Sequence, residues 1–214
     1  VGLNSYYLQG GYYNDNTSVK LITFGGKERT YHAWNYASKE EMEKYGRRYN
    51  SCGYMYTDDN GIDHFYEDQT DNYVQKNYQL LFNHNFTSAW NVNAGLHYTK
   101  GDGYYQEYKD GRELVEYGLL PYEHDGETVN ESDLIRKKAM DNRFGGGIFS
   151  VNYKGDRLHA SLGGGLNRYD GDHFGKVLWV KNYIGNLDPD KDYHRNNATK
   201  NDGNLYLKAD YELC

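Results

Sequence analysis

Hydrophobic and polar residues alternate along two neighbouring stretches of the chain. From Val74 to Phe86 most even positions are apolar or aromatic, and most odd positions are Asn or Gln. From Trp90 to Tyr98 the even positions are again apolar, and the odd ones are Asn, Gly or His. Such alternation is typical of a β-strand with two different faces. Only residues 87–89 separate the stretches, so we predict a hairpin with a three-residue loop.

The loop length fixes which residues of this hairpin lie opposite one another. On one face the predicted pairs are Phe86–Trp90, Phe82–Ala94, Leu80–Leu96 and Tyr78–Tyr98. On the other face they are Asn85–Asn91, Asn83–Asn93 and Gln79–His97. One face is therefore polar, and the other is apolar with aromatic residues at both ends.

A second hairpin is expected around Gly155-Asp156, a dipeptide suited to a two-residue turn. The predicted pairs are Phe149–Leu162, Val151–Ala160 and Tyr153–Leu158 on one face, and Ser150–Ser161 and Asn152–His159 on the other. Glycines 145–147 then lie beside glycines 164–165. We interpret these glycines as relieving curvature; the alternative is that they leave space for a solute or a plug.

Three further strands bring the predicted total to seven. They are Val1–Tyr13, Ser18–Trp34, with a bulge expected near Leu21-Ile22, and a strand over 204–213. Short turns near 14–17, 87–89 and 155–156 alternate with long connections over 35–72, 104–142 and 171–202. Outer-membrane barrels sort their connections in this way, and bacterial single-chain barrels usually have an even strand number. We predict an all-β fold, an antiparallel transmembrane β-barrel fragment of about seven strands with long extracellular loops, internal to a larger barrel.

The composition excludes several other classes. The net charge of −7 disfavours a nucleic-acid partner, which requires a basic footprint. The mean hydropathy is −1.01, and no apolar run approaches the roughly 20 residues of a transmembrane helix. The 25 Tyr and only 2 Pro argue against disorder. A barrel reconciles low hydrophobicity with a fold, because one face of each strand is wet.

Two connections contain helix-like segments. Residues 38–46 combine a capping box at Ser38 and Glu41 with a terminal glycine, which predicts a short helix. A shorter helix is expected over Ser132–Lys138. The acidic run 58–61 with Glu67 lacks a ligand that a calcium loop needs at Tyr56, so we predict a solvated turn and no metal site or cofactor.

The sequence carries none of the common hydrolase, zinc-protease or nucleotide-binding signatures, so we do not expect an enzyme. Of the histidines, His84 is placed on the apolar face. The lumen-facing polar residues are predicted to be Gln79, Asn83, Asn91, Asn93, His97, Asn152 and His159. Aromatic residues of the outer loops are the candidate ligand contacts: Trp34, Tyr36, Tyr54, Tyr56, Tyr105 and Trp179. The alternative is that some belong to an interfacial aromatic girdle.

Several segments together resemble one family. They include Gly10-Gly11-Tyr12-Tyr13, 20–34, 49–55, 69–73, 96–101 with 103–105, 133–136, 167–175 and 195–200. In combination they resemble the barrel of TonB-dependent outer-membrane receptors of the Bacteroidota type. The resemblance implies that residues 1–214 are part of one β-barrel domain in the bacterial outer membrane, within a 22-stranded barrel whose plug domain is absent here.

The resemblance also implies a function and partners. Such receptors bind a scarce nutrient, such as a metal chelate, haem, cobalamin or a glycan, and import it to the periplasm. The implied partners are the plug domain of the same chain, the TonB complex acting through that plug, the nutrient, outer-membrane lipid and a surface lipoprotein. No ligand residue carries over by motif.

Two other classes remain open. A secreted β-rich carbohydrate-binding module would explain the tyrosines, but not the sorted connections. An outer-membrane hydrolase of barrel form would need a clustered acid, base and nucleophile, which the sequence does not offer.

Overall fold

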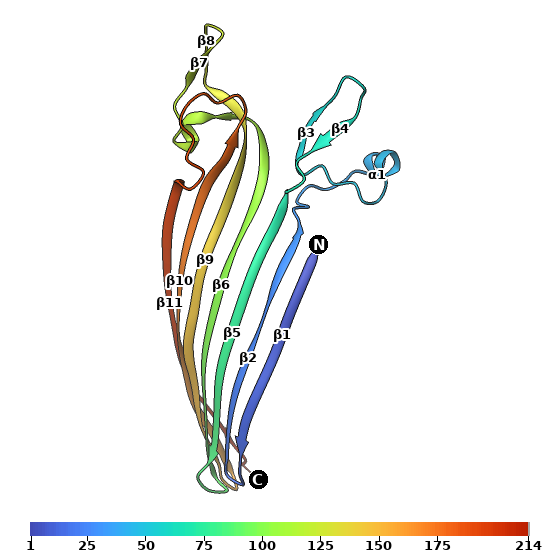
Figure 1. Cartoon of the computed structure of the whole chain (residues 1–214). Helices are drawn as coiled ribbons and strands as arrows, with labels where there is room; N and C mark the ends of the chain where they lie inside the picture. The colour runs from blue at the N-terminus through green and yellow to red at the C-terminus, as the bar shows by residue number, and fades with distance from the viewer. Residues whose placement is uncertain (214) are drawn as a thin grey trace.

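Seven long strands form one open antiparallel sheet (Figure 1). The structure is a computed structural model and describes residues 1–213. The sheet strands are β1 (Gly2–Tyr13), β2 (Thr17–Tyr31), β5 (Thr70–Asn85), β6 (Trp90–Glu113), β9 (Glu131–Lys154), β10 (Leu158–Val180) and β11 (Asp192–Tyr211). The smaller elements are α1 (Lys39–Tyr45), β3 (Tyr54–Thr57), β4 (Asp63–Phe65), η1 (Leu114–Tyr117), β7 (Tyr122–His124) and β8 (Glu127–Val129).

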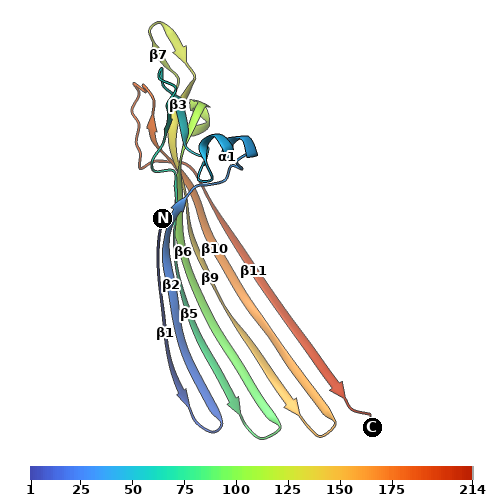
Figure 2. The ribbon, with the colours of Figure 1, turned by 90° about the vertical axis from the view of Figure 1, so that its right-hand side faces the viewer.

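The strands follow one another in chain order, so the sheet is a simple meander with β1 and β11 at its edges. Figure 2 shows three short turns at one end and all the smaller elements at the other. We call these the turn end and the loop end. The predicted seven-stranded, all-β architecture and its sorting of short and long connections are confirmed, and the sheet is not closed.

The register of the first hairpin is confirmed. Tyr78 lies opposite Tyr98, and Asn83 lies opposite Asn93. The backbone amide of Phe86 donates to the carbonyl of Trp90 at 3.0 Å, which closes the three-residue loop.

The register predicted for the second hairpin is wrong by two residues. Leu162 lies opposite Val151, Ala160 opposite Tyr153, and Ser161 opposite Asn152. The amide of Gly155 donates to the carbonyl of Leu158 at 2.8 Å, so Asp156 and Arg157 form the turn.

Packing gives a physical reason for the observed register. It sets Phe149 and Ile148 opposite Gly164 and Gly165, so that large side chains lie beside small ones. Both registers place the same residues on the same face, so alternation alone does not distinguish them. The two glycine runs do lie on adjoining strands, although out of the predicted alignment.

Five strands (β5, β6, β9, β10 and β11) extend further toward the loop end than predicted, whereas β2 ends at Tyr31, short of the predicted Trp34. The connections are 32–69, 114–130 and 181–191. Residues 132–138, predicted as a helix, lie in β9. The cause is the residue pattern: beyond Tyr98 both faces of the strands carry polar or charged side chains, so hydrophobic alternation disappears although pairing continues.

Local details are mixed. The helix at 38–46 is confirmed, with the Ser38 hydroxyl accepting from the Glu41 amide at 3.1 Å and the Glu41 carboxylate accepting from the Ser38 amide at 2.7 Å. The bulge expected at Leu21-Ile22 is wrong, because β2 pairs without interruption on both sides. Pairing shifts instead near the loop end, between Lys109 and Arg112, at Gly175/Lys176 and between Val177 and Trp179.

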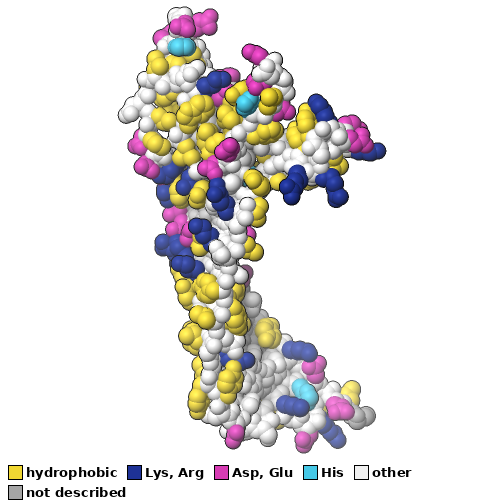
Figure 3. Space-filling model, turned by 45° about the vertical axis from the view of Figure 1, so that its right-hand side comes forward, with side chains coloured by type: hydrophobic (Ala, Val, Ile, Leu, Met, Phe, Trp, Pro, Cys, Tyr) yellow, Lys and Arg dark blue, Asp and Glu magenta, His cyan; other side chains and the backbone are white. Residues whose placement is uncertain are grey.

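The sheet has two chemically different faces. The outer face carries four successive rows of mostly apolar residues near the turn end, which we call the apolar band. On β5 and β6 the band comprises Phe86, His84, Phe82, Leu80, Trp90, Val92, Ala94 and Leu96, and it ends at Tyr78 and Tyr98. Its side chains are open to the surroundings; Leu166 and Leu207 are 74% and 75% exposed. Figure 3 shows hydrophobic side chains along this lower part of the sheet.

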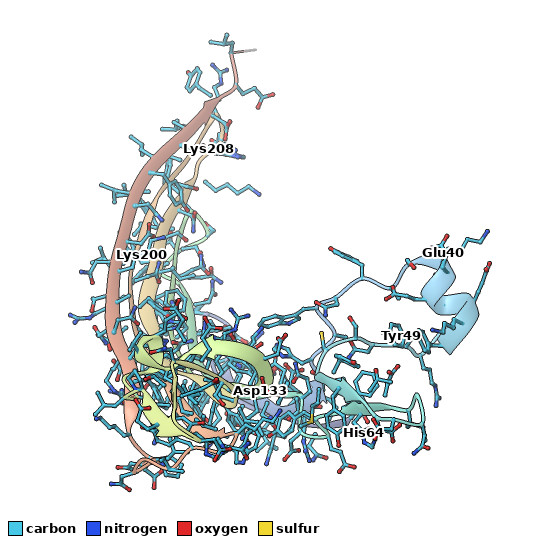
Figure 4. All side chains as sticks on the ribbon, turned by 90° about the horizontal axis from the view of Figure 1, so that it is seen from above. Glu40, Tyr49, His64, Asp133, Lys200 and Lys208 are labelled. Atoms are coloured by element: carbon cyan, nitrogen blue, oxygen red, sulfur yellow. The ribbon has the colours of Figure 1, made fainter. Side chains whose placement is uncertain are left out.

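A small hydrophobic core lies at the loop end rather than within the sheet. It consists of Leu114, Tyr117, Leu134, Val177 and Val180. These residues tie η1 to the first residues of β9 and the last residues of β10. Viewed from above, the sheet forms an arc, and the segment with Glu40, Tyr49 and His64 projects away from it (Figure 4).

Candidate functional site: the inner face and its loop-end pocket

The inner face, opposite the apolar band, carries a ladder of amide side chains near the turn end. Asn83 Nδ2 donates to Asn93 Oδ1 at 2.6 Å, and Asn93 Nδ2 reaches Ser150 Oγ at 3.3 Å. One row nearer the turns, Asn91 donates to Asn85 at 2.7 Å, and Asn152 donates to Asn91 at 3.2 Å. Because each amide both donates and accepts, the rows satisfy one another across neighbouring strands.

One interaction of the inner face spans three strands. His97 Nε2 lies 2.8 Å from Asn167 Oδ1, and Gly146 of β9 lies between the two residues. A Cβ at Gly146 would stand 2.3 Å from Asn167 Oδ1. Glycine is therefore required beneath this bridge, which favours a packing role over mere relief of curvature.

A cavity of about 500 Å³ lies over this amide-rich part of the inner face, so the face is hollowed near the turn end. Its floor includes Leu81, Gly95 and Ile148, an apolar island among the amides. Ile148 is 57% exposed. Lys20 is the charged residue of the lining.

A second cavity of about 380 Å³ lies on the inner face at the loop end; we call it the loop-end pocket. Aromatic walls come from Trp34, Tyr73 and Tyr105, and Lys138 and Asp71 add one charge of each sign. The strand residues His173 and His194 complete the polar lining. Flat aromatic rings beside a few polar groups form a surface suited to a small ligand.

His32 fixes one wall of the loop-end pocket. His32 is 1% exposed, and its ring packs against Trp34 and Tyr105 at centroid distances of 3.7 and 4.6 Å. Burial lowers the pKa of His32, although the nearby Glu107 and Asp71 carboxylates oppose this shift. Among the described residues neither ring nitrogen has a hydrogen-bond partner. The backbone is held by Gln69 at 3.0 Å and by the Asn50 side chain at 3.1 Å.

Beside His32 lies a buried ion cluster around Glu107, which is 3% exposed. Arg136 Nε donates to its carboxylate at 2.7 Å, and Lys109 Nζ lies 3.0 Å away. Burial alone would raise the pKa of Glu107, but the hydrogen bonds and charges of Lys109 and Arg136 outweigh burial and lower it. Arg136 also donates to the Tyr117 hydroxyl at 3.0 Å, which links the cluster to η1.

The structure brings only some of the predicted ligand contacts together. Trp34 and Tyr105 meet in the loop-end pocket, with ring centroids 4.9 Å apart. Tyr54 and Tyr56 belong to the β3–β4 hairpin, where they pack on Phe65 and His64. Tyr36 is fully exposed in the first connection, and Trp179 lies in β10, 40% exposed.

The predicted polar residues of the sheet all share the inner face, and only the partner predicted for His159 is corrected. Gln79, Asn83, Asn91, Asn93, His97 and Asn152 all belong to inner-face rows. His159 does not pair with Asn152 but lies opposite Lys154, near the turn. The error follows from the two-residue shift of the second hairpin.

The loop-end pocket is lined by residues that the sequence pattern did not single out, namely Tyr73, Lys138, His173 and His194. His32, also not singled out, packs behind the wall formed by Trp34 and Tyr105. The sequence pattern assigned Lys138, His173 and His194 to long connections, although these residues lie in β9, β10 and β11. The sequence signal available for this part of β9 was the alternation of Lys138, Met140 and Asn142 on one side of the strand. That signal is weak because the residues on the two sides do not differ in hydrophobicity.

The described residues contain no group of three or more His, Cys, Asp or Glu arranged to hold a metal ion. No helix within the described part of the chain is long and apolar enough to cross a membrane.

Comparison with known proteins adds no relative to this picture. No protein-family model matches the chain, and no curated protein matches it.

Proposed function

We propose that this sheet is part of a transmembrane β-barrel of the bacterial outer membrane, of the TonB-dependent receptor type, which binds a scarce nutrient and imports it. The supporting observation is that the two faces of the sheet differ: the outer face carries an apolar band bounded by aromatic rows, and the inner face carries a hydrogen-bonded amide ladder. In water the exposed leucines of the band would each cost about 1.5–3 kcal/mol relative to burial. Contact with lipid removes that cost.

The height of the band supports the proposal. Trp90 and Tyr98 are eight residues apart on β6. At ~3.4 Å per residue this is about 27 Å along the strand, or about 20 Å across the membrane at a tilt of ~40°, near the ~25 Å typical of outer-membrane barrels. His84 fits within the band because its Nδ1 lies 2.8 Å from the Thr17 hydroxyl.

The edges support a larger barrel. All six strand pairings are antiparallel, so β1 and β11 run in the same direction. They cannot pair with each other in an all-antiparallel barrel. Closure therefore requires an odd number of additional strands, since an unpaired edge is not tolerated in lipid.

In this proposal the nutrient binds first at the loop-end pocket, and a plug domain occupies the hollow inner face. The amide ladder would hydrogen-bond the plug, and TonB would act on the plug from the periplasm. A surface lipoprotein would meet the exposed loop-end elements. The nutrient classes are those of the family, namely metal chelates, haem, cobalamin and glycans.

Orientation tests the membrane proposal. Asn60 lies in the exposed turn between β3 and β4. In a protein with Cys52→Ser and Cys214→Ser, we expect Asn60→Cys to react with a membrane-impermeant maleimide on intact cells. A matched Asp156→Cys, at the turn end, should react only after lysis. Reaction of both residues without lysis would contradict a membrane-spanning sheet.

Ligand binding tests the pocket. The detergent-purified protein can be titrated separately with cobalamin, haem, an iron–catecholate complex and a maltooligosaccharide. We expect one of these probes to quench the tryptophan fluorescence. Trp34→Phe should remove most of that change, and Trp179→Phe should retain it. Equal effects of the two variants would contradict a site at the loop-end pocket.

The secreted carbohydrate-binding module remains the second candidate, because the aromatic pocket alone would suit a sugar ring. It leaves the exposed apolar band without a partner. A protein that stays soluble and monomeric without detergent would favour it.

A further inference from the structure

Two rows of like charges cross the outer face directly beyond the aromatic row of Tyr78 and Tyr98. In the first row Lys76, Lys100 and Arg143 lie opposite one another on β5, β6 and β9. In the next row Asp102, Asp141 and Asp172 lie opposite one another on β6, β9 and β10. Like charges directly opposite in a sheet are destabilising. The stability of the sheet itself therefore does not explain this arrangement.

The two rows neutralise each other only in part. Lys100 forms an ion pair with Asp141, and Asp172 lies 3.3 Å from Arg195. Among the described residues, neither Lys76 nor Arg143 has a carboxylate oxygen within 4.0 Å. Arg143 faces Asp170, but that carboxylate accepts hydrogen bonds from Thr199 at 3.0 Å and Asn197 at 3.3 Å. Two cations of the row are therefore available to an external anion.

The height of the row identifies the anion. Lys100 is two residues beyond Tyr98, or about 7 Å along the strand. An aromatic row marks the membrane interface, so a row of cations just beyond it lies among lipid headgroups. Figure 3 shows dark blue side chains gathered above the hydrophobic part of the sheet. Guanidinium and ammonium groups both bind phosphate, the former in a bidentate manner.

We propose that Lys76, Lys100 and Arg143 form a binding site for the phosphates of lipid headgroups in the leaflet at the loop end. The inference rests on the proposed membrane insertion and goes beyond nutrient import. Such a site would fix the depth of the sheet in the bilayer and hold an anionic lipid against it.

Native mass spectrometry of the full protein in detergent tests the site, with bisphosphorylated lipid A as the probe. The test variant is Lys76→Gln with Arg143→Gln, which leaves the Lys100–Asp141 ion pair intact. The matched control is Lys154→Gln with Lys200→Gln, which removes the same charge from inner-face rows. We expect the test variant to bind the lipid roughly 10- to 30-fold more weakly, and the control to bind as the unmodified protein does. Circular dichroism establishes that each variant is folded.

Three results would overturn the inference: undiminished binding by the test variant, equal loss in both variants, or displacement of the lipid by millimolar inorganic phosphate, which would indicate a free-anion site. Failure of the unmodified protein to enter lipid nanodiscs is a different result. It would overturn the proposed membrane function, on which the inference depends.

Discussion

At Gly146 the lack of a side chain allows His97 to reach Asn167 across a strand. We expect Gly146→Val to break this bridge, because its Cβ would stand 2.3 Å from Asn167 Oδ1 and 2.4 Å from the Leu166 carbonyl oxygen. The cost should be about 1–3 kcal/mol of overpacking, measured as a lower melting temperature in detergent. Gly2→Val, where a Cβ meets nothing within 4 Å, is the control. Equal effects of the two changes would contradict a packing role for Gly146.

Glu107 gives the loop end a pH dependence. Its pKa is lower in the folded protein than its ordinary value of 4.5. Its ion pairs therefore contribute fully above the unfolded pKa, and that contribution is lost as the pH falls through the folded pKa. We expect Glu107→Gln to cost about 3 kcal/mol at pH 7 by leaving Arg136 without its buried partner, and to cost less as the pH falls below 4.5. Thermal melts of both proteins at pH 7 and pH 3.5 measure this.

A surface pair provides the comparison for Glu107. Glu43 lies 3.8 Å from Lys39 on α1, and both side chains are largely exposed. Glu43→Gln should change stability by less than about 0.5 kcal/mol at either pH. A Glu107 effect as small as this, or independent of pH, would contradict the buried ion cluster.

At the scale of strands, the corrected second hairpin can be tested by cross-linking. Directly opposed residues have Cβ atoms about 4.5–5.5 Å apart, and diagonal neighbours are about 7–8 Å apart. In a protein without Cys52 and Cys214, we expect Asn152→Cys with Ser161→Cys to form a disulfide under mild oxidation. Asn152→Cys with His159→Cys should remain reduced. The opposite result, seen as gel mobility with and without reductant, would restore the register predicted from the sequence.

The two hairpins show what the sequence can predict. In the first, a three-residue loop and strict alternation leave one register, which the structure confirms. In the second, registers two residues apart place the same side chains on the same faces. Only the packing of Phe149 and Ile148 on glycines distinguishes them, and packing is a tertiary property.

The sequence likewise predicted some residues of the loop-end pocket and missed others. Trp34 and Tyr105 could be named because aromatic residues are conspicuous in a polar segment. Lys138, His173 and His194 could not be placed, because strand pairing continues where hydrophobic contrast has ended. His32, which packs behind the pocket wall, falls within the strand predicted over Ser18–Trp34, but β2 ends at Tyr31 and His32 begins the connection.

At the scale of the molecule, a membrane-spanning sheet requires its two faces to meet different surroundings, lipid on the outer face and water or protein on the inner face. Leu96 and His97 are adjacent on β6 and point to opposite faces, the first within the apolar band and the second on the inner face. Spin labels at Leu96→Cys and His97→Cys, in the protein reconstituted in nanodiscs, report these surroundings through collisions with oxygen and with a water-soluble nickel chelate. We predict that oxygen dominates at position 96 and the chelate at position 97. Dominant chelate access at both positions would place the band in water and contradict the membrane-spanning sheet.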